Sequence, residues 1–270
     1  MTKIIFFDID GTLLSFRTHQ VPQSTIEAVR KARRMGIKIW IATGRPLSFV
    51  SNLGELEYDG LLCVNGGHCR LQTNEQKAEE ATIIYTKPID PADIERMVDE
   101  QRRNGLAIVY AGTNDAFLAA PNGVPESVTQ IFTLLDIKMP RLAEPEEALG
   151  MDILELNAFY EESDRERIMG DILKSCNETR WHPVFADCIP KGTNKATGID
   201  QVIRHYGFDI SETMAFGDGE NDIEMLQHAG IGVAMGNASD AVKAAADIVT
   251  DSVDDNGVAN ILNRFVINKE

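Results

Sequence analysis

The stretch from residue 3 to residue 14 constrains the fold more than any other part of the chain. Ile4–Phe7 is apolar throughout, and Asp8 and Asp10 follow it directly, with Gly11 after them. An uninterrupted apolar run is typical of a strand that is covered on both faces, as in a parallel sheet. The two acids then fall at the carboxyl end of that strand, which is the edge where open α/β sheets bind ligands.

Two carboxylates one residue apart repel each other. We therefore expect Mg²⁺ or a shared proton to compensate the charges of Asp8 and Asp10. The alternative is a solvated strand end at which the two aspartates cap a turn.

The composition is that of a globular protein, and it narrows the possible partners. With 270 residues, 43% of them hydrophobic and 25% charged, the chain forms one large domain or a core with an insertion. The net charge of −16 argues against nucleic acid and anionic membranes, because both bind basic surfaces. The four cysteines lack zinc-ligand spacing, and no apolar stretch reaches the roughly 18 residues of a membrane helix. Since no signal peptide is visible either, we expect a soluble, cytoplasmic protein with reduced thiols.

Strand and helix patterns alternate at the start of the chain. Residues 21–35 have helical spacing, and the apolar runs 37–42 and 61–64 each end in small or polar residues. A strand, a helix and a strand at this spacing form the βαβ unit of a parallel sheet. All three strand ends are therefore expected on the edge that carries Asp8.

The pattern changes near residue 82, where prolines become frequent. The predicted elements that follow lack strict βαβ alternation and indicate an inserted α+β module: helices at 93–103, 128–135 and 165–173, a hairpin at 106–119, and strands at 153–159 and 180–185. The parallel-sheet pattern resumes near residue 191, with strands predicted at 213–216, 231–235 and 247–250.

Several polar residues at these strand ends combine into a candidate metal site. Asp218 follows the strand predicted at 213–216, and with Asp8 and Asp10 it offers the carboxylate oxygens that Mg²⁺ prefers. Asp218 and the glycine after it also form a common turn pair. Only their position at a strand end, in order with the other motifs, favours a metal ligand over a turn.

A second set is suited to holding a phosphate group. Thr43 supplies a hydroxyl, and the backbone N–H groups of Gly44 and Arg45 lie where a helix is expected to begin, which makes a natural anion site. Lys195 supplies a point charge. Taken singly, Lys195 is explained as a surface lysine and Asn221 as a helix cap. Together with the carboxylates, the set is typical of a phosphoryl-transfer site.

The order of these motifs resembles the haloacid dehalogenase-like (HAD) phosphatases. The four motifs of that superfamily correspond here to Asp8–Leu13, Thr43–Arg45, Lys195 and Gly217–Asp222. The segments that resemble its Cof-type branch are residues 190–195, 232–238, 246–250 and 256–258. The resemblance implies a Rossmann-like parallel-sheet core with an inserted α+β cap of class IIB. We accordingly expect the core at 1–82 and 188–270 and the substrate-specifying cap at 83–187.

The resemblance also implies roles for individual residues. Asp8 corresponds to the nucleophile that forms an aspartyl-phosphate, and Asp10 to the general acid and base. The Mg²⁺ ligands correspond to Asp8, Asp10 (through its backbone carbonyl) and Asp218. Asp222 corresponds to a residue that supports the metal site without binding the cation directly. The residues that correspond to phosphate contacts are Thr43, Gly44, Arg45, Lys195 and Asn221.

The function implied is that of a Mg²⁺-dependent phosphatase for small phosphate monoesters, with sugar phosphates the first candidates. The alternatives are a phosphotransferase or mutase on the same substrates, and a non-catalytic sensor of phosphorylated ligands. The expected assembly state is a monomer or a weak homo-oligomer. Candidates for substrate contacts in the cap, each of them also explained as cap core or surface, are Asn157, Phe159, Trp181 and His182.

Overall fold

The structure is a computed structural model that describes residues 1–51, 53–73, 76, 80–135 and 137–267. The chain forms two compact units. The first contains residues 1–44, 50–85 and 194–270, and the second contains residues 45–49 and 86–193. The sequence predicted that the chain passes from the core to the cap after residue 82 and returns to the core after residue 187. The described residues include no helix with the length and apolar character needed to cross a membrane.

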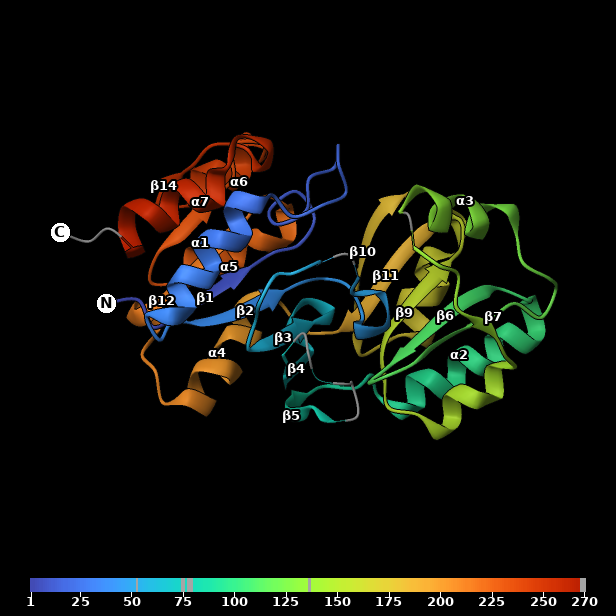
Figure 1. Ribbon diagram of the computed structural model, residues 1–270. Helices are drawn as coiled ribbons and strands as arrows, with labels where there is room; N and C mark the ends of the chain where they lie inside the picture. The colour runs from blue at the N-terminus through green and yellow to red at the C-terminus, as the bar shows by residue number, and fades with distance from the viewer. Residues whose placement is uncertain (52, 74–75, 77–79, 136, 268–270) are drawn as a thin grey trace. The chain divides into compact units, whose positions relative to one another are not determined.

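The first unit is built on an eight-stranded sheet in the order β14-β13-β12-β1-β2-β3-β4-β5 (Figure 1). Its strands are β1 (Ile4–Phe7), β2 (Lys38–Ala42), β3 (Gly60–Cys63), β4 (His68–Leu71), β5 (Thr82–Thr86), β12 (Thr213–Gly217), β13 (Gly232–Ala234) and β14 (Ile248–Val249). The pairs from β14 to β3 are parallel, and β4 runs antiparallel to β3. The predicted α/β class with a parallel-sheet core is confirmed.

Helices cover the central strands on both faces, as the apolar run in β1 requires. The helices are α1 (Gln23–Arg34), α4 (Lys195–Tyr206), α5 (Ile223–His228), α6 (Asp240–Ala245) and α7 (Gly257–Ile261). Ile4 and Phe6 share a buried cluster with residues of α4, α5 and α6, whereas Ile5 and Phe7 are equally buried and point the other way. Figure 1 shows α1 and α4 on opposite sides of β1 and β2. All four apolar side chains of β1 are therefore removed from water, which makes this strand a rigid base for Asp8.

The parallel pattern ends at β3, which the sequence did not indicate. Val64 and Asn65 adopt positive φ angles of 53° and 48°, and with Gly66 they turn the chain back into the antiparallel strand β4. The stretch near residue 82 was expected to open the inserted module, but Thr82–Thr86 forms the outermost strand of this first sheet.

The second unit contains a six-stranded sheet in the order β10-β11-β9-β6-β7-β8. Its strands are β6 (Ala107–Gly112), β7 (Ala116–Ala119), β8 (Arg141–Leu142), β9 (Ile153–Phe159), β10 (Cys176–His182) and β11 (Phe185–Pro190), and its helices are α2 (Pro91–Asn104) and α3 (Glu126–Leu134). The pairs are antiparallel apart from β7 and β8. The apolar side of α2 packs on one face of this sheet, and that of α3 packs on the other.

One prediction in this unit was wrong in detail. The single strand expected at 180–185 is a pair of strands, because the chain reverses at Pro183 and Val184 between β10 and β11. The helix expected at 165–173 is present over residues 165–172, with π-type hydrogen bonding at Arg167–Ile172. The remaining short helical turns of the chain are Leu47–Phe49, Val64–Gly66, Pro145–Gly150, Glu162–Asp164, Ile210–Glu212, Glu220–Asp222, Val253–Asp255 and the π-type turn Leu262–Ile267.

Candidate active site

Asp8 lies at the end of the most central strand of the first unit. β1 pairs with β2 on one side and with β12 on the other, with Phe7 opposite Ile41 and Phe216. Because these strands are parallel and in register, the residues that follow them leave the sheet at one edge. Asp8, Thr43 and Asp218 are consequently brought to the same edge, as the sequence predicted.

Lys195 joins this edge from the first turn of α4. The side chain of Asn194 accepts a hydrogen bond from the backbone of Thr197, 2.8 Å away, which fixes where the helix begins. Lys195 is fully buried, and its Nζ atom donates to Oδ1 of Asp8 and to Oδ1 of Asp222, each at 2.6 Å. Burial opposes the charge of Lys195, but Asp222 and Asp8 outweigh it and hold its pKa above the usual value.

The carboxylate of Asp222 is fully engaged by neighbours within the protein. Its Oδ1 atom accepts from Lys195, and its Oδ2 atom accepts from the backbone N–H groups of Asp218 and Gly219, both at 2.9 Å. Asp222 lies so close to Gly217 that a Cβ on this glycine would be 2.5 Å from the Cβ of Asp222. Asp222 thus fixes the Asp218 turn and the position of Lys195.

Asp218 is held by two residues to which the sequence gave no role. Thr12 donates its hydroxyl to Oδ1 of Asp218 at 2.8 Å, and Asn237 donates Nδ2 to Oδ2 at 3.0 Å. The same amide group also donates to the carbonyl oxygen of Gly11 at 2.9 Å. Gly11 has a φ angle of +86°, and a side chain there would collide with the Asp218 carboxylate.

The acidic side chains fit a divalent cation. One carboxylate oxygen from each of Asp8, Asp218 and Asp222 lies within 4.8 Å of the others. Burial raises the pKa of Asp8 well above its usual value; Lys195 lowers it in part, and the other two aspartates raise it. Burial also raises the pKa of Asp218 to about 6, against the hydrogen bond from Thr12. One lysine does not balance three carboxylates, so this edge favours a bound cation.

Asp10 occupies a different position from these three acids. Its side chain is half-buried, and its backbone pairs with Leu14 in an isolated bridge that closes the loop after β1. Its carboxylate is outside the cluster that Asp8, Asp218 and Asp222 form. The roles of Asp10 as a backbone metal ligand and as a proton donor and acceptor therefore stay predictions.

The predicted phosphate contacts Thr43, Gly44 and Asn221 belong to the first unit. Thr43 is buried, and its carbonyl oxygen accepts from the N–H of Asn65 at 3.0 Å. Asn221 donates Nδ2 to Oδ1 of Asn65 at 3.0 Å, and a Cβ on Gly44 would lie 3.3 to 3.4 Å from these two amides. Asn65 is therefore a further residue of this edge. The Asn-Gly-Gly run after β3 was its only signal in the sequence.

Arg45 belongs to the second compact unit, where Nη1 donates to the carbonyl oxygen of Phe49 at 3.1 Å. A short helix does begin near Gly44 and Arg45, two residues after Arg45. The described chain forms only a single 3₁₀ turn, Leu47–Phe49, after Pro46. Gly44 and Arg45 therefore precede this turn and lie outside it.

The cap candidates lie on the sheet of the second unit. Asn157 on β9 donates Nδ2 to Glu155 at 2.6 Å and to Asp187 on β11 at 2.8 Å. Burial, and then the charge of Asp187, raise the pKa of Glu155 well above its usual value. Phe159 packs edge-on against Phe185, with ring centroids 5.1 Å apart. His182 accepts a hydrogen bond from the N–H of Val184 at 3.4 Å, and the side chain of Trp181 lies outside the described part of the structure.

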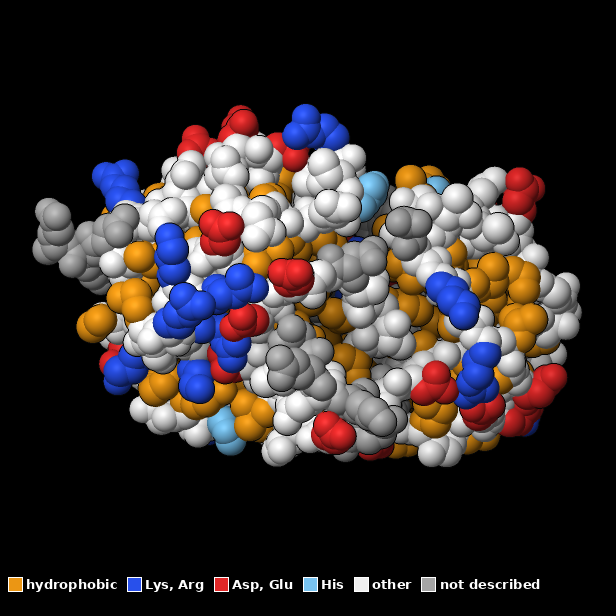
Figure 2. All heavy atoms as spheres, in the orientation of Figure 1, with side chains coloured by type: hydrophobic (Ala, Val, Ile, Leu, Met, Phe, Trp, Pro, Cys, Tyr) orange, Lys and Arg blue, Asp and Glu red, His pale blue; other side chains and the backbone are white. Residues whose placement is uncertain are grey.

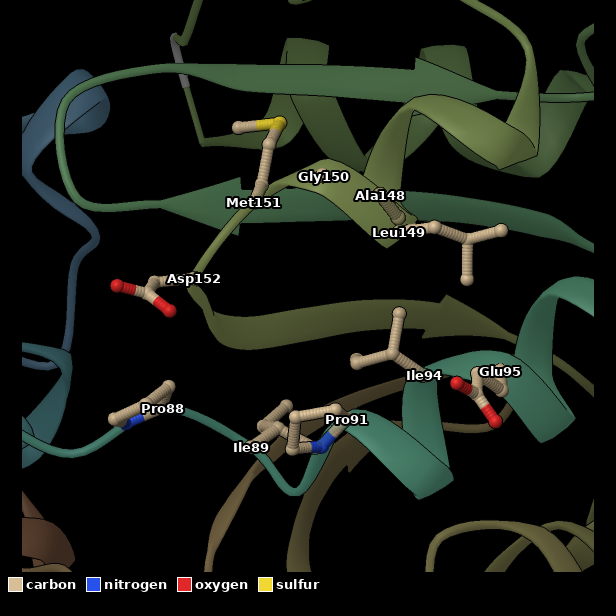
Figure 3. Close-up of a pocket in the computed structure, with 10 residues that line it drawn as sticks. All are labelled: Pro88, Ile89, Pro91, Ile94, Glu95, Ala148, Leu149, Gly150, Met151 and Asp152. Atoms are coloured by element: carbon tan, nitrogen blue, oxygen red, sulfur yellow. The ribbon is translucent and has the colours of Figure 1, made fainter.

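A pocket of about 380 Å³ lies elsewhere on the second unit, between the start of α2 and the turn Pro145–Gly150 (Figure 3). Ile94 and Leu149 give it apolar walls, and Glu95 and Asp152 are its acidic groups. None of its described lining residues is a lysine or arginine. It therefore lacks a positive group that would hold a phosphate.

Figure 2 shows lysine and arginine side chains gathered over α1, whose last turn carries Lys31, Arg33 and Arg34. Arg33 donates to Glu57 at 2.8 Å and to Asp59 at 3.0 Å. These basic groups complement the carboxyl end of the helix and the neighbouring acids. This surface is accordingly a weaker candidate for an anionic substrate than the edge with Lys195.

Comparison with known proteins agrees with this geometry. A sequence profile described as haloacid dehalogenase-like hydrolase matches residues 5–262. The solved structure of BT4131, described as a HAD subclass IIB sugar phosphatase, has 39% sequence identity and a TM-score of 0.81, and the match covers 98% of this chain and 100% of that chain. BT1666 from Bacteroides thetaiotaomicron, described among the phosphatases of the haloalkanoate superfamily, has 38% identity and a TM-score of 0.83, covering 99% of this chain and 96% of that chain.

A further relative of known name is the pyridoxal phosphate phosphatase YbhA from Escherichia coli strain K12. It is 31% identical over 273 residues, which cover 93% of this chain and 96% of that protein. The relatives span nearly the full chain, so the likeness extends beyond the core motifs to the inserted second unit. The chain belongs to the haloacid dehalogenase-like hydrolase family, as a Cof-type phosphatase.

Proposed function

We propose that the chain is a Mg²⁺-dependent phosphatase that hydrolyses small phosphorylated metabolites, with sugar phosphates as the first candidates, through an aspartyl-phosphate on Asp8. The observation that carries the proposal is the placement of Lys195. Its Nζ atom lies 2.6 Å from Oδ1 of Asp8 and from Oδ1 of Asp222, at an edge that also carries Asp218. A buried lysine that donates to the carboxylate of a candidate nucleophile is suited to holding this nucleophile and a phosphate group together.

In the first step, an oxygen of Asp8 attacks the phosphorus atom and the bond to the leaving oxygen breaks. Lys195 already holds Oδ1 of Asp8, which leaves the second oxygen of this carboxylate for the attack. Asp10 donates a proton to the leaving oxygen, so that the product departs as an alcohol. Thr43, Gly44 and Asn221 are proposed to hold the phosphoryl oxygens, with Arg45 as a further contact.

In the second step, Asp10 takes a proton from a water molecule whose oxygen attacks the phosphorus of the aspartyl-phosphate. The P–O bond to Asp8 breaks, and inorganic phosphate leaves. Asp8 and Asp218, with the backbone carbonyl of Asp10, would hold Mg²⁺, and the bound ion would reduce the repulsion between the carboxylate and the phosphate. Asp222 keeps Lys195 and the Asp218 turn in place during both steps.

We propose that the second unit is the cap that distinguishes substrates, with polar residues such as Asn157 among its contacts. The support for this role is the class of the solved relatives, since BT4131 is described as a subclass IIB sugar phosphatase. A cytoplasmic location and a monomeric or weakly associating state are part of the same proposal. None of the four cysteines, all of them described and buried, forms a disulfide, in agreement with a reducing compartment.

The test is a screen of purified protein with Mg²⁺ against a panel of phosphate monoesters, run beside Asp8→Asn. The amide is isosteric, so the fold is expected to persist while kcat falls by several orders of magnitude. Hydrolysis in ¹⁸O-labelled water places the label in the released phosphate if water is the acceptor, whereas transfer to a second hydroxyl gives a new, unlabelled phosphate ester and releases no phosphate. An Asp8→Asn variant with a tenth of the wild-type kcat would refute the mechanism, and a wild type that binds these esters without turnover would favour a sensor.

A further inference from the structure

Phe16 is an exposed aromatic side chain beside the candidate active site. It has 65% of its surface exposed, and it is the one aromatic residue among the exposed large hydrophobic residues of the described chain. The four residues that follow it, Arg17 to Gln20, are exposed and polar. An isolated aromatic ring among polar neighbours is too small for a protein-docking surface, which needs a contiguous apolar patch. Its size suits one face of a small ligand.

The loop that carries Phe16 is firmly built. Ser15 is 1% exposed, and its hydroxyl accepts the backbone N–H groups of Arg17 at 3.1 Å and Thr18 at 3.2 Å. The same hydroxyl donates to Oδ1 of Asp254 at 2.7 Å, and the N–H of His19 donates to the Ser15 carbonyl at 2.8 Å. These bonds determine the direction of the loop on either side of Phe16, so its exposure belongs to an ordered conformation.

The anchor of this loop is connected to the metal-binding edge. Asp254 lies in the 3₁₀ turn Val253–Asp255, and the N–H of Val253 donates to Oδ1 of Asn237 at 3.1 Å. The amide nitrogen of the same Asn237 bridges Gly11 and Asp218. Hydrogen bonds, together with the peptide bond between Val253 and Asp254, therefore connect the Phe16 loop to the carboxylate of Asp218, all within the first unit.

The ring of Phe16 lies against the loop after β1. A Cβ on Gly11 would be 2.7 Å from Cε2 of Phe16, and it would also collide with the carboxylate of Asp218. Gly11 directly follows Asp10, about 3.8 Å away between Cα atoms. Because Asp10 protonates the leaving oxygen in the proposed reaction, the leaving group would lie next to Asp10, beside the loop on which Phe16 packs.

We propose that Phe16 is a specificity-determining residue whose ring packs on the leaving group and favours phosphate esters of cyclic alcohols over open-chain ones. A sugar ring presents a face of C–H groups that an aromatic ring contacts well, whereas an open chain must lose rotational freedom to make the same contact. This inference rests on the proposed function and adds to it a preference for ring-shaped leaving groups. It also divides the discrimination of substrates: the core distinguishes ring from chain, and the cap distinguishes one ring from another.

The test compares glucose 6-phosphate with sorbitol 6-phosphate, which have the same number of carbons and differ in ring closure. For Phe16→Ala we expect the ratio of the two kcat/KM values to fall about five- to tenfold, mainly through a higher KM for the cyclic ester. Phe16→Tyr keeps the ring and should keep the ratio. Thr18→Ala, an exposed change in the same loop, is the matched control and should leave both constants within twofold.

Binding supplies a readout that does not require turnover. In the Asp8→Asn background, calorimetric titration with the same two esters should show that Phe16→Ala weakens the cyclic ester more than the open-chain ester. An unchanged ratio in both assays, or an equal loss for both esters, refutes the role of Phe16 and leaves the phosphatase proposal standing. A wild type that hydrolyses no phosphate ester refutes the proposed function, and this inference with it.

Discussion

Replacing Lys195 by methionine tests the charge balance on which the candidate site depends. Methionine has a comparable length and fills the same buried volume without the charge, so the change isolates the electrostatic role of Nζ. It leaves Asp8 and Asp222, which accept from Lys195 at 2.6 Å, with no cation. Lys195 and Asp222 are fully buried, so solvent does not replace the lost interaction.

The expected loss of stability follows from that burial. Removing one member of a buried ion pair costs about 3–5 kcal/mol, and here a single lysine serves two carboxylates, so we expect the upper half of that range. Lys31→Met, on the exposed surface of α1, is the control and should stay within about 0.5 kcal/mol of wild type. Adding Asp222→Asn to Lys195→Met removes one orphaned charge and should restore part of the loss.

The assay is denaturant unfolding in the presence of EDTA, followed by the fluorescence of Trp40, which is fully buried in the sheet of the first unit. A Trp181→Phe background makes Trp40 the only tryptophan of the chain, which has two. A loss below about 1 kcal/mol for Lys195→Met would mean that the pair is balanced by its own desolvation. Lys195 would then not be the group that compensates the charges of Asp8 and Asp222, and its proposed role in the site would be refuted.

Three further predictions address pH, metal and cap. Burial, and then the charge of Arg70, lower the pKa of His68 to about 4 in the folded protein, against 6.5 in the unfolded chain. The unfolded state therefore binds more protons below pH 6.5, and the free energy of unfolding should fall by up to about 3 kcal/mol as the pH drops to 4. His68→Phe should flatten this dependence, and an NMR pKa above 6 for His68 would contradict it. EDTA should abolish hydrolysis without changing the circular dichroism spectrum, and Mg²⁺ should restore activity, whereas full activity in EDTA would exclude a metal role. Asp187→Asn should alter the ranking of ring sugar phosphates while kcat/KM for p-nitrophenyl phosphate stays within twofold, and an unchanged ranking would argue against its part in substrate choice.

The arrangement of the strand ends could be predicted because it depends on local patterns. An apolar run followed by Asp8, and a second one followed by Asp218, specify two parallel strands whose carboxyl ends meet. The contact of Lys195 with Asp8 follows once the first turn of α4 is placed at the same edge. Periodicity and turn residues determine such features, and both are visible in one sequence.

The residues that sequence reasoning missed act over long separations. Asn237 reaches back 226 residues to the carbonyl of Gly11, and Thr12 reaches Asp218 across 206 residues. No local sequence pattern predicts which distant residue a single side-chain amide or hydroxyl contacts. The reversal between β10 and β11 was missed for a related reason, since the pairing of these two strands depends on the packing of the second unit more than on a local preference.

The order of the strands in the first sheet has a consequence for biosynthesis. β1 is made first, but its neighbour β12 is made more than 200 residues later, after the whole second unit. Until Thr213–Gly217 leaves the ribosome, the fully apolar strand β1 has one bare edge, which is a template for pairing with other chains. We therefore expect N-terminal fragments that end before β12 to aggregate, and ribosome-bound chains of that length to recruit chaperones, even though the complete sheet protects β1 on both sides.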